Sequence, residues 1–264
     1  MKLVIAEKPS VAISIAKVIG ANKKKDGYYE GNGYRVSWCV GHLIQMANPD
    51  AYDEKYAKWN MADLPIIPSD YKYEVAKATK KQFNILKKLM NDKEVDTVIN
   101  ACDAGREGES IFRLVYNQVN CKKKMKRLWI SSMEDNAIKE GFDNLTDGKD
   151  YDNLFESAQA RAIADWLVGM NISRLYSCLY QQNYSVGRVQ TPTLAMIVKR
   201  DDEIANFKKE KYYTVELSTN GFTLSTDRID DEVAAEQLLN LVGDKIEITD
   251  VIQKEKITKP DLPF

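Results

Sequence analysis

Apolar residues in the first half of the chain follow two alternating patterns. Short, mostly apolar runs, such as residues 3–6 and 98–102, predict strands. Between them, apolar residues recur every three or four positions and predict amphipathic helices. Strands are predicted at residues 3–6, 98–102 and 127–131, and helices at residues 10–19 (capped by Ser10 and ended by Gly20), 79–91, 109–115 and 134–142. This repeated order over about the first 145 residues favours a parallel α/β sheet with helices on both faces.

Two segments interrupt that order. Residues 28–40 alternate around Gly31-Asn32-Gly33, which predicts a β-hairpin. Residues 49–68 begin and end with proline and predict a long irregular connection, a type of segment that often has a function.

The apolar pattern changes in the second half of the chain. A long helix is predicted at residues 154–175, and another at residues 194–203 with Thr191 or Thr193 as its cap. From Tyr212 the period becomes two, which predicts a β-rich region. Its predicted elements are strands at residues 212–219 and 222–225 with a turn at Asn220-Gly221, a helix at residues 231–242 and an extended stretch at residues 246–257.

Composition narrows the class of protein. The chain has 264 residues, 44% of them hydrophobic and 29% charged, which is typical of a soluble protein with two domains. The net charge is −1, so any nucleic-acid partner must bind to a local basic patch, because the overall charge does not attract it. The four cysteines form no Cys-x-x-Cys pair, which argues against a zinc site and a disulfide framework. Neither a signal peptide nor a long apolar segment is evident, so we expect a cytoplasmic protein with no membrane partner.

The densest chemical signal is an acidic turn between the strand at residues 98–102 and the following helix. Asp103, Glu107 and Glu109 crowd this turn, which favours either a bound hard cation or a raised carboxyl pKa. The alternative is a solvated helix N-terminus, where carboxylates interact favourably with the helix dipole. Glu7 and Lys8 follow the first strand in the same way. If the two strands are parallel neighbours, Glu7 faces the acidic turn.

The chain has one histidine, His42, and a lone histidine is more often structural than catalytic.

Three separated motifs together resemble the bacterial type IA DNA topoisomerases, most closely the topoisomerase III group. They are Ile5-Ala6-Glu7-Lys8-Pro9-Ser10, Asp103-Ala104-Gly105-Arg106-Glu107-Gly108-Glu109 and Ser185-Val186-Gly187-Arg188-Val189-Gln190-Thr191-Pro192-Thr193. The segments Trp129–Ser132 and Asp165–Asn171 add to the match. The acidic motif alone indicates only a Toprim domain, which primases and some nucleases share.

The resemblance implies an architecture of three parts. Residues 1–145 would form the Toprim domain, an α/β domain with a parallel sheet. Residues 146–210 would form the first part of a helical domain with a groove for single-stranded DNA. Residues 211–264 would begin a β-rich arch.

The resemblance also implies the chemistry of strand passage. The family cuts one DNA strand through a 5′-phosphotyrosine, passes another strand and reseals the cut, which relaxes negative supercoils or decatenates DNA. None of the 14 tyrosines lies in the family's nucleophile motif, so we expect an N-terminal fragment that does not cut DNA by itself. The alternatives are a Toprim nuclease or primase-like enzyme and a non-catalytic single-stranded DNA-binding module.

Residue roles follow from the same resemblance. Lys8 would stabilise the phosphate, and Glu7 would donate a proton to the leaving oxygen, because crowding by other carboxylates favours its protonated form. Mg²⁺ would be held by Glu7, Asp103 and Glu107, although Gly105 replaces the second aspartate of the family pattern Asp-x-Asp-x-Glu. The DNA-binding residues would be Arg161, Asp165, Ser185, Val186, Gly187, Arg188, Val189 and Gln190. A helicase is a further possible partner.

Overall fold

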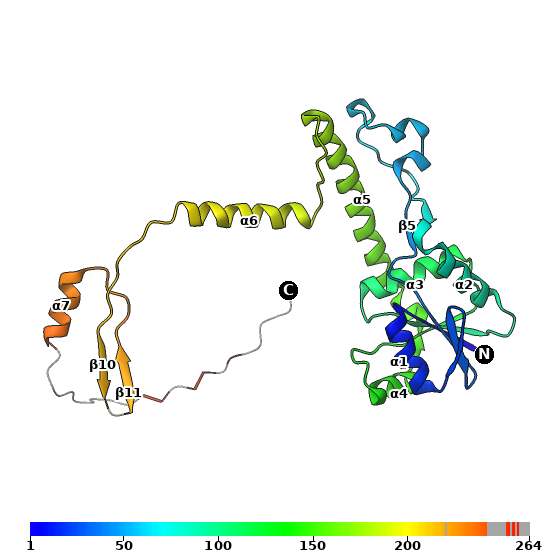
Figure 1. Ribbon diagram of the computed structural model, residues 1–264, viewed down its shortest axis with the longest axis horizontal. Coiled ribbons are helices and arrows are strands. Elements are labelled where there is room, and N and C mark those ends of the chain that lie inside the picture. Colours follow the sequence, from blue (N-terminus) through cyan, green and yellow to red (C-terminus); the bar gives the residue numbers. More distant parts are fainter. Residues whose placement is uncertain (220, 242–251, 254, 257, 259–264) are drawn as a thin grey trace. The chain divides into compact units, whose positions relative to one another are not determined.

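The computed structural model describes residues 1–219, 221–241, 252–253, 255–256 and 258. The chain divides into two compact units, residues 1–196 and residues 197–264. The first unit contains a seven-stranded sheet and most of the helices (Figure 1).

The sheet in the first unit is mixed, with parallel strands at its centre. The strand order is β2-β3-β4-β1-β7-β8-β9. Strands β4, β1, β7 and β8 are parallel to one another, whereas β2, β3 and β9 pair antiparallel at the two sides. The bounds are β1 Lys2–Ala6, β2 Lys23–Lys25, β3 Tyr28–Gly31, β4 Tyr34–Trp38, β7 Thr97–Ala101, β8 Lys124–Arg127 and β9 Thr146–Asp147.

Alternate residues of β1 face two separate hydrophobic clusters. Leu3 and Ile5 pack with α2 (Lys80–Asn91) and α3 (Arg106–Gln118). Val4 and Ala6 pack with α1 (Pro9–Ile19) and α4 (Asp135–Asp143). Because side chains alternate between the faces of a strand, a run that is apolar throughout is buried on both sides. The predicted α/β domain with helices on both faces is confirmed.

The predicted hairpin is β3 and β4, in which Gly31 is paired with Tyr34. Its two turn residues, Asn32 and Gly33, have φ values of 48° and 78°, as a two-residue type I′ turn requires. The irregular connection predicted at residues 49–68 lies between β5 (Ile44–Met46) and β6 (Tyr73–Val75) and contains the short 3₁₀ helices η1 Pro49–Ala51, η2 Glu54–Ala57 and η3 Met61–Asp63.

A 29-residue helix, α5 (Asp152–Tyr180), packs against α3 and against the long connection. Trp166 donates its indole N–H to the Ala47 carbonyl at 3.1 Å. Asn171 accepts from the Ile66 N–H at 2.6 Å and donates to the Ile66 carbonyl at 3.0 Å. The long helix therefore fixes two points of a segment that has little regular structure of its own.

The later elements follow the predicted order. They are α6 Gln190–Ala205, β10 Glu216–Thr219, β11 Phe222–Ser225 and α7 Glu232–Leu241, with β10 and β11 antiparallel. Asn220 of the predicted turn and most of the predicted extended stretch at residues 246–257 lie outside the described residues. In the described part of the chain, no helix has both the length and the apolar character to cross a membrane.

Three local predictions are wrong. The cap of α1 is Lys8 and not Ser10, because Pro9 occupies the first helical position. The strand expected at residues 127–131 is β8, Lys124–Arg127. The strand begins and ends earlier in the sequence than expected, and the buried Leu128 lies just beyond its end. Thr191 and Thr193 lie inside α6, which begins at Gln190.

Candidate functional site

The carboxyl ends of β1 and β7 bring Glu7 and the acidic turn together. The two strands are parallel neighbours, with Ala6 opposite Ala101. The Asp103 N–H donates to Glu7 Oε2 at 3.3 Å. Glu7 is half-buried, whereas Asp103 and Lys8 are exposed. The expected meeting of the first strand's end with the acidic turn is therefore present.

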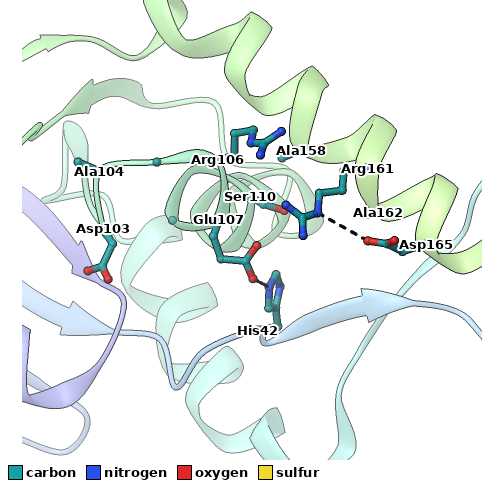
Figure 2. A pocket seen from close by; sticks show the side chains of 12 residues that line it. His42, Asp103, Ala104, Arg106, Glu107, Ser110, Ala158, Arg161, Ala162 and Asp165 are labelled. Atoms are coloured by element: carbon teal, nitrogen blue, oxygen red, sulfur yellow. Dashed lines mark hydrogen bonds and ion pairs between the residues drawn. The ribbon is translucent and has the colours of Figure 1, made fainter. Parts of the chain in front are cut away.

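Asp103 also borders a cleft of about 450 Å³ between the start of α3 and one face of α5 (Figure 2). The acidic turn forms one wall, and Arg161 and Asp165 of α5 form the other. The cleft thus joins two groups of residues that the sequence separates by more than 50 positions. Its lining combines carboxylates with arginines, which suits a ligand that has a phosphate and a bound cation.

Glu107 has a partner that the sequence did not indicate. His42 Nε2 lies 2.5 Å from Glu107 Oε1, and the histidine lines the same cleft. Figure 2 shows the Glu107 carboxylate directed at His42 and the Asp103 carboxylate directed elsewhere. His42 therefore belongs to the site. The sequence signal was its position just after β4, which is the other parallel neighbour of β1.

Glu109 is separate from the other two acidic residues of the turn. It is 1% exposed, accepts from the Asn100 amide at 2.9 Å and from Arg113 Nε at 2.8 Å, and lies 3.3 Å from Arg127 Nε. A buried carboxylate needs such partners, because an unpaired buried charge is very costly. Glu109 is thus part of the support beneath the turn and not a cleft residue.

Two glycines of the turn have opposite surroundings. A Cβ added at Gly108 would lie 2.2 Å from the Asp103 carbonyl oxygen, so the helix can approach the loop only with glycine there. At Gly105, which takes the place of the family's second aspartate, an added Cβ has no neighbour within 4 Å. Gly105 also has an extended φ of 167°, which other residues adopt without strain.

Two of the proposed DNA-binding residues, Arg161 and Arg188, pair with a third, Asp165. Its carboxylate lies 2.6 Å from Arg188 Nε and 3.7 Å from Arg161 Nε. The loop that holds Arg188 is fixed to α5 by Ser173, whose hydroxyl accepts from the Val186 N–H at 2.9 Å. Arg161, Asp165 and Arg188 are therefore one group, and they are each 41–51% exposed.

The remaining members of that loop are exposed or half-buried. Gln190 donates its amide to the Ser185 hydroxyl at 2.7 Å, and the Gly187 N–H donates to the Thr191 hydroxyl at 3.1 Å. Val189 is 63% exposed. These contacts close the loop on itself at the first turn of α6.

The three expected metal ligands, Glu7, Asp103 and Glu107, would each supply oxygen atoms, but the structure does not bring all three together. Across the described residues, no group of three or more His, Cys, Asp or Glu side chains is arranged to hold a metal ion. Glu7 and Asp103 are adjacent, whereas Glu107 is paired with His42. Mg²⁺ commonly uses only one or two carboxylates and takes its other ligands from water and phosphate, so Glu7 and Asp103 fit a hard cation chemically.

Two family models match most of the chain. The model of the Toprim domain matches residues 2–133, and a model described as DNA topoisomerase matches residues 149–264. A solved structure of full-length topoisomerase I from Thermotoga maritima has a similar fold, with a TM-score of 0.60 at 24% identity, and the match covers 89% of this chain and 37% of that one.

Curated relatives are more similar in sequence. DNA topoisomerase 3 of Bacillus thuringiensis (strain Al Hakam) is 52% identical over 217 residues, which cover 82% of this chain and 30% of that protein. The Bacillus subtilis (strain 168) protein of the same name is 43% identical over 262 residues, which cover 96% of this chain and 36% of that protein. The chain thus spans about a third of the length of these relatives. Since the Toprim model matches half of it and the topoisomerase model most of the remainder, the chain belongs to the type IA DNA topoisomerase family and is similar to topoisomerase 3.

Proposed function

We propose that this chain supplies the metal-binding and single-stranded DNA-binding part of a type IA strand-passage enzyme. The contact between the Asp103 N–H and the Glu7 carboxylate carries the proposal, because Asp103 also borders the cleft formed with α5. The whole reaction would cut one strand through a tyrosine, pass another strand and reseal the first, and so relax or decatenate DNA. This chain would not cut DNA by itself.

Residues at the end of β1, on α5 and in the loop before α6 each have a role in this proposal. Lys8, at the start of α1, would stabilise the charge of the scissile phosphate as a compact cation. Glu7 would hold the proton that the leaving oxygen receives. Arg161, Asp165 and the loop Ser185–Gln190 would follow the DNA backbone, since contacts to phosphate position a strand without reading its sequence.

Type IA topoisomerases are metal-dependent, and we propose Mg²⁺ as the ion. Glu7 and Asp103 would hold it, and Glu107 would join them once it leaves His42. When bound, the ion would supply positive charge that stabilises the phosphate. We further propose a cytoplasmic location, a helicase partner, and domain ranges of 1–145, 146–210 and 211–264.

The DNA-binding half of the proposal can be tested on this chain. Fluorescence anisotropy with a labelled oligothymidylate should show binding that weakens as salt increases. Arg188→Ala should weaken binding and lower the slope of log affinity against log salt by about 0.7, the value for one lost phosphate contact on a single strand. Arg200→Ala, an exposed arginine paired with Glu203 on α6, is the matched control and should leave the slope unchanged. Salt-independent or absent binding would contradict the proposal.

The catalytic half requires a complete enzyme. A chimera in which this chain replaces the matching segment of the B. subtilis topoisomerase 3 should relax negatively supercoiled DNA with Mg²⁺. Lys8→Ala and Glu7→Gln should each reduce the rate at least about a hundredfold, the scale of one electrostatic or acid–base contribution. Nicking without a covalent protein–DNA adduct would instead indicate a Toprim nuclease. DNA binding without any reaction would indicate a binding module.

A further inference from the structure

Arg127, the last residue of β8, is 1% exposed and directs its guanidinium at the end of β7. Its Nη1 donates to the carbonyls of Asn100 at 3.1 Å, Cys102 at 2.7 Å and Leu128 at 3.1 Å. Its Nη2 donates to the Asp103 carbonyl at 2.7 Å. Three of these four carbonyls belong to the strand end and turn that present Asp103 to the cleft.

The other buried arginine of this sheet has a different arrangement. Arg35 on β4 pairs with the carboxylates of Glu30 and Asp92 at 2.8 Å and of Glu94 at 2.6 Å. It therefore acts as a charge partner for acids that are partly or fully exposed, at a distance from the cleft. Arg127 forms an ion pair with Glu109 at 3.3 Å and uses both Nη atoms on backbone carbonyls.

Burial of Arg127 is costly, and its surroundings reduce that cost only in part. Burial lowers the pKa of its guanidinium, and the Glu109 charge opposes this effect. Its Nε is buried without a hydrogen-bond partner. The rings of Trp129 and Tyr151 lie 5.0 and 5.9 Å from the guanidinium carbon, close enough for cation–π attraction. A hydrophobic residue would avoid the desolvation cost, but it would leave the turn carbonyls without donors.

The Asp103 carbonyl is held from a second side as well. Gly108 lies so close that a Cβ there would be 2.2 Å from this oxygen. The Cys102 N–H is fixed by the Asn100 side-chain carbonyl at 3.0 Å. Because the carbonyl and the carboxylate of Asp103 leave the same Cα, fixing the peptide restricts where the carboxylate can point.

We propose that Arg127 is a positioning residue for metal binding: by holding the carbonyls of Cys102 and Asp103, it aims the Asp103 carboxylate at the metal beside Glu7. This inference rests on the proposed function, since it requires that Asp103 binds a divalent cation. Arg127 itself contacts neither the metal nor DNA. A lysine cannot replace it, because an ammonium on a flexible stem does not reproduce the planar, forked donors of a guanidinium.

The test measures Mn²⁺ binding by the full 264-residue chain with electron paramagnetic resonance. Unfolding and circular dichroism are measured in parallel to show that each variant is folded. Arg127→Lys should weaken Mn²⁺ binding by about ten- to a hundredfold, the range for residues that orient metal ligands. Arg35→Lys is the matched control, because it changes a buried arginine of the same sheet away from the cleft. It should lower stability and leave the Mn²⁺ dissociation constant unchanged.

The outcomes separate the two proposals. If the unchanged chain binds no Mn²⁺ at Asp103, as judged by Asp103→Asn, the proposed metal site fails. If it binds Mn²⁺ and folded Arg127→Lys binds equally well, the metal site stands and the role of Arg127 is overturned. Should Arg127→Lys not fold, Gly108→Ala displaces the same carbonyl while Arg127 remains. Unchanged Mn²⁺ affinity in that folded variant would equally overturn the inference.

Discussion

At the scale of single residues, the acidic turn depends on where side chains are missing. Gly108 allows the first turn of α3 to lie against the Asp103 carbonyl. Gly105 has open space at its Cβ position and an extended backbone. One glycine is thus required by packing, whereas the other leaves room for the aspartate of the Asp-x-Asp-x-Glu pattern.

Gly105→Asp should strengthen binding of divalent metal by about fivefold. A unit charge about 4 Å from a divalent ion contributes roughly 2 kcal/mol even in water, and screening by salt reduces the gain to about half. Mn²⁺ titration measures the change, with Gly105→Asn as the uncharged control of the same size. Equal affinity in the two variants would show that position 105 does not face the metal.

At the scale of elements, α5 organises the surrounding segments. It holds the long connection through Trp166 and Asn171, and it holds the loop before α6 through Ser173. Arg113 of α3 pairs with Asp152, in the first turn of α5, at 2.6 Å. The cleft is thus bounded by a helix whose position is fixed from several sides.

Asn171→Ala should destabilise the chain by about 1–3 kcal/mol, because it leaves the N–H and carbonyl of the buried Ile66 without their partners. Urea unfolding measures the loss. Asn91→Ala, which removes an exposed amide bonded only within α2, is the control and should cost less. Equal losses would mean that the two-bond contact to Ile66 adds nothing.

At the scale of the whole molecule, ion pairs near the surface connect segments that are distant in sequence. Arg35 links β3 and β4 to the residues after α2. The Glu94 N–H and the Arg35 guanidinium hold the pKa of Asp92 below its usual range. A carboxylate with a lowered pKa stabilises the folded state above its unfolded pKa of about 3.9, and this stabilisation is lost as the pH falls through the folded pKa.

Asp92→Asn should therefore be less stable than the unchanged chain at neutral pH, and the difference should shrink as the pH falls below about 4. Urea unfolding midpoints at neutral and acidic pH measure this difference. A difference that stays constant across this range would contradict the assigned role of Asp92.

How much of this was predictable depends on whether the signal is local in sequence. The ends of β1 and β7 carry their acids directly after buried runs, so the meeting of Glu7 and Asp103 followed from parallel pairing. His42 and Arg127 did not follow. His42 enters the cleft only because β4 pairs parallel with β1, which the hairpin pattern does not specify.

The strand ending at Arg127 was misplaced for a related reason. The apolar Leu128 and Ile130 favour a strand at residues 127–131, but both lie beyond the end of β8 and pack in the cluster formed with α1 and α4. The strand itself contains two lysines, neither of them buried, and pairs with the short edge strand β9.

The shared contact of Arg161 and Arg188 with Asp165 has a consequence for selectivity. Asp165 is a built-in competitor for any anion that approaches these arginines. A single phosphate must displace a tethered carboxylate at high effective concentration and gains little in return. A strand that offers several phosphates at once would overcome that competition, so we expect the cleft to favour polymers over nucleotides or free phosphate.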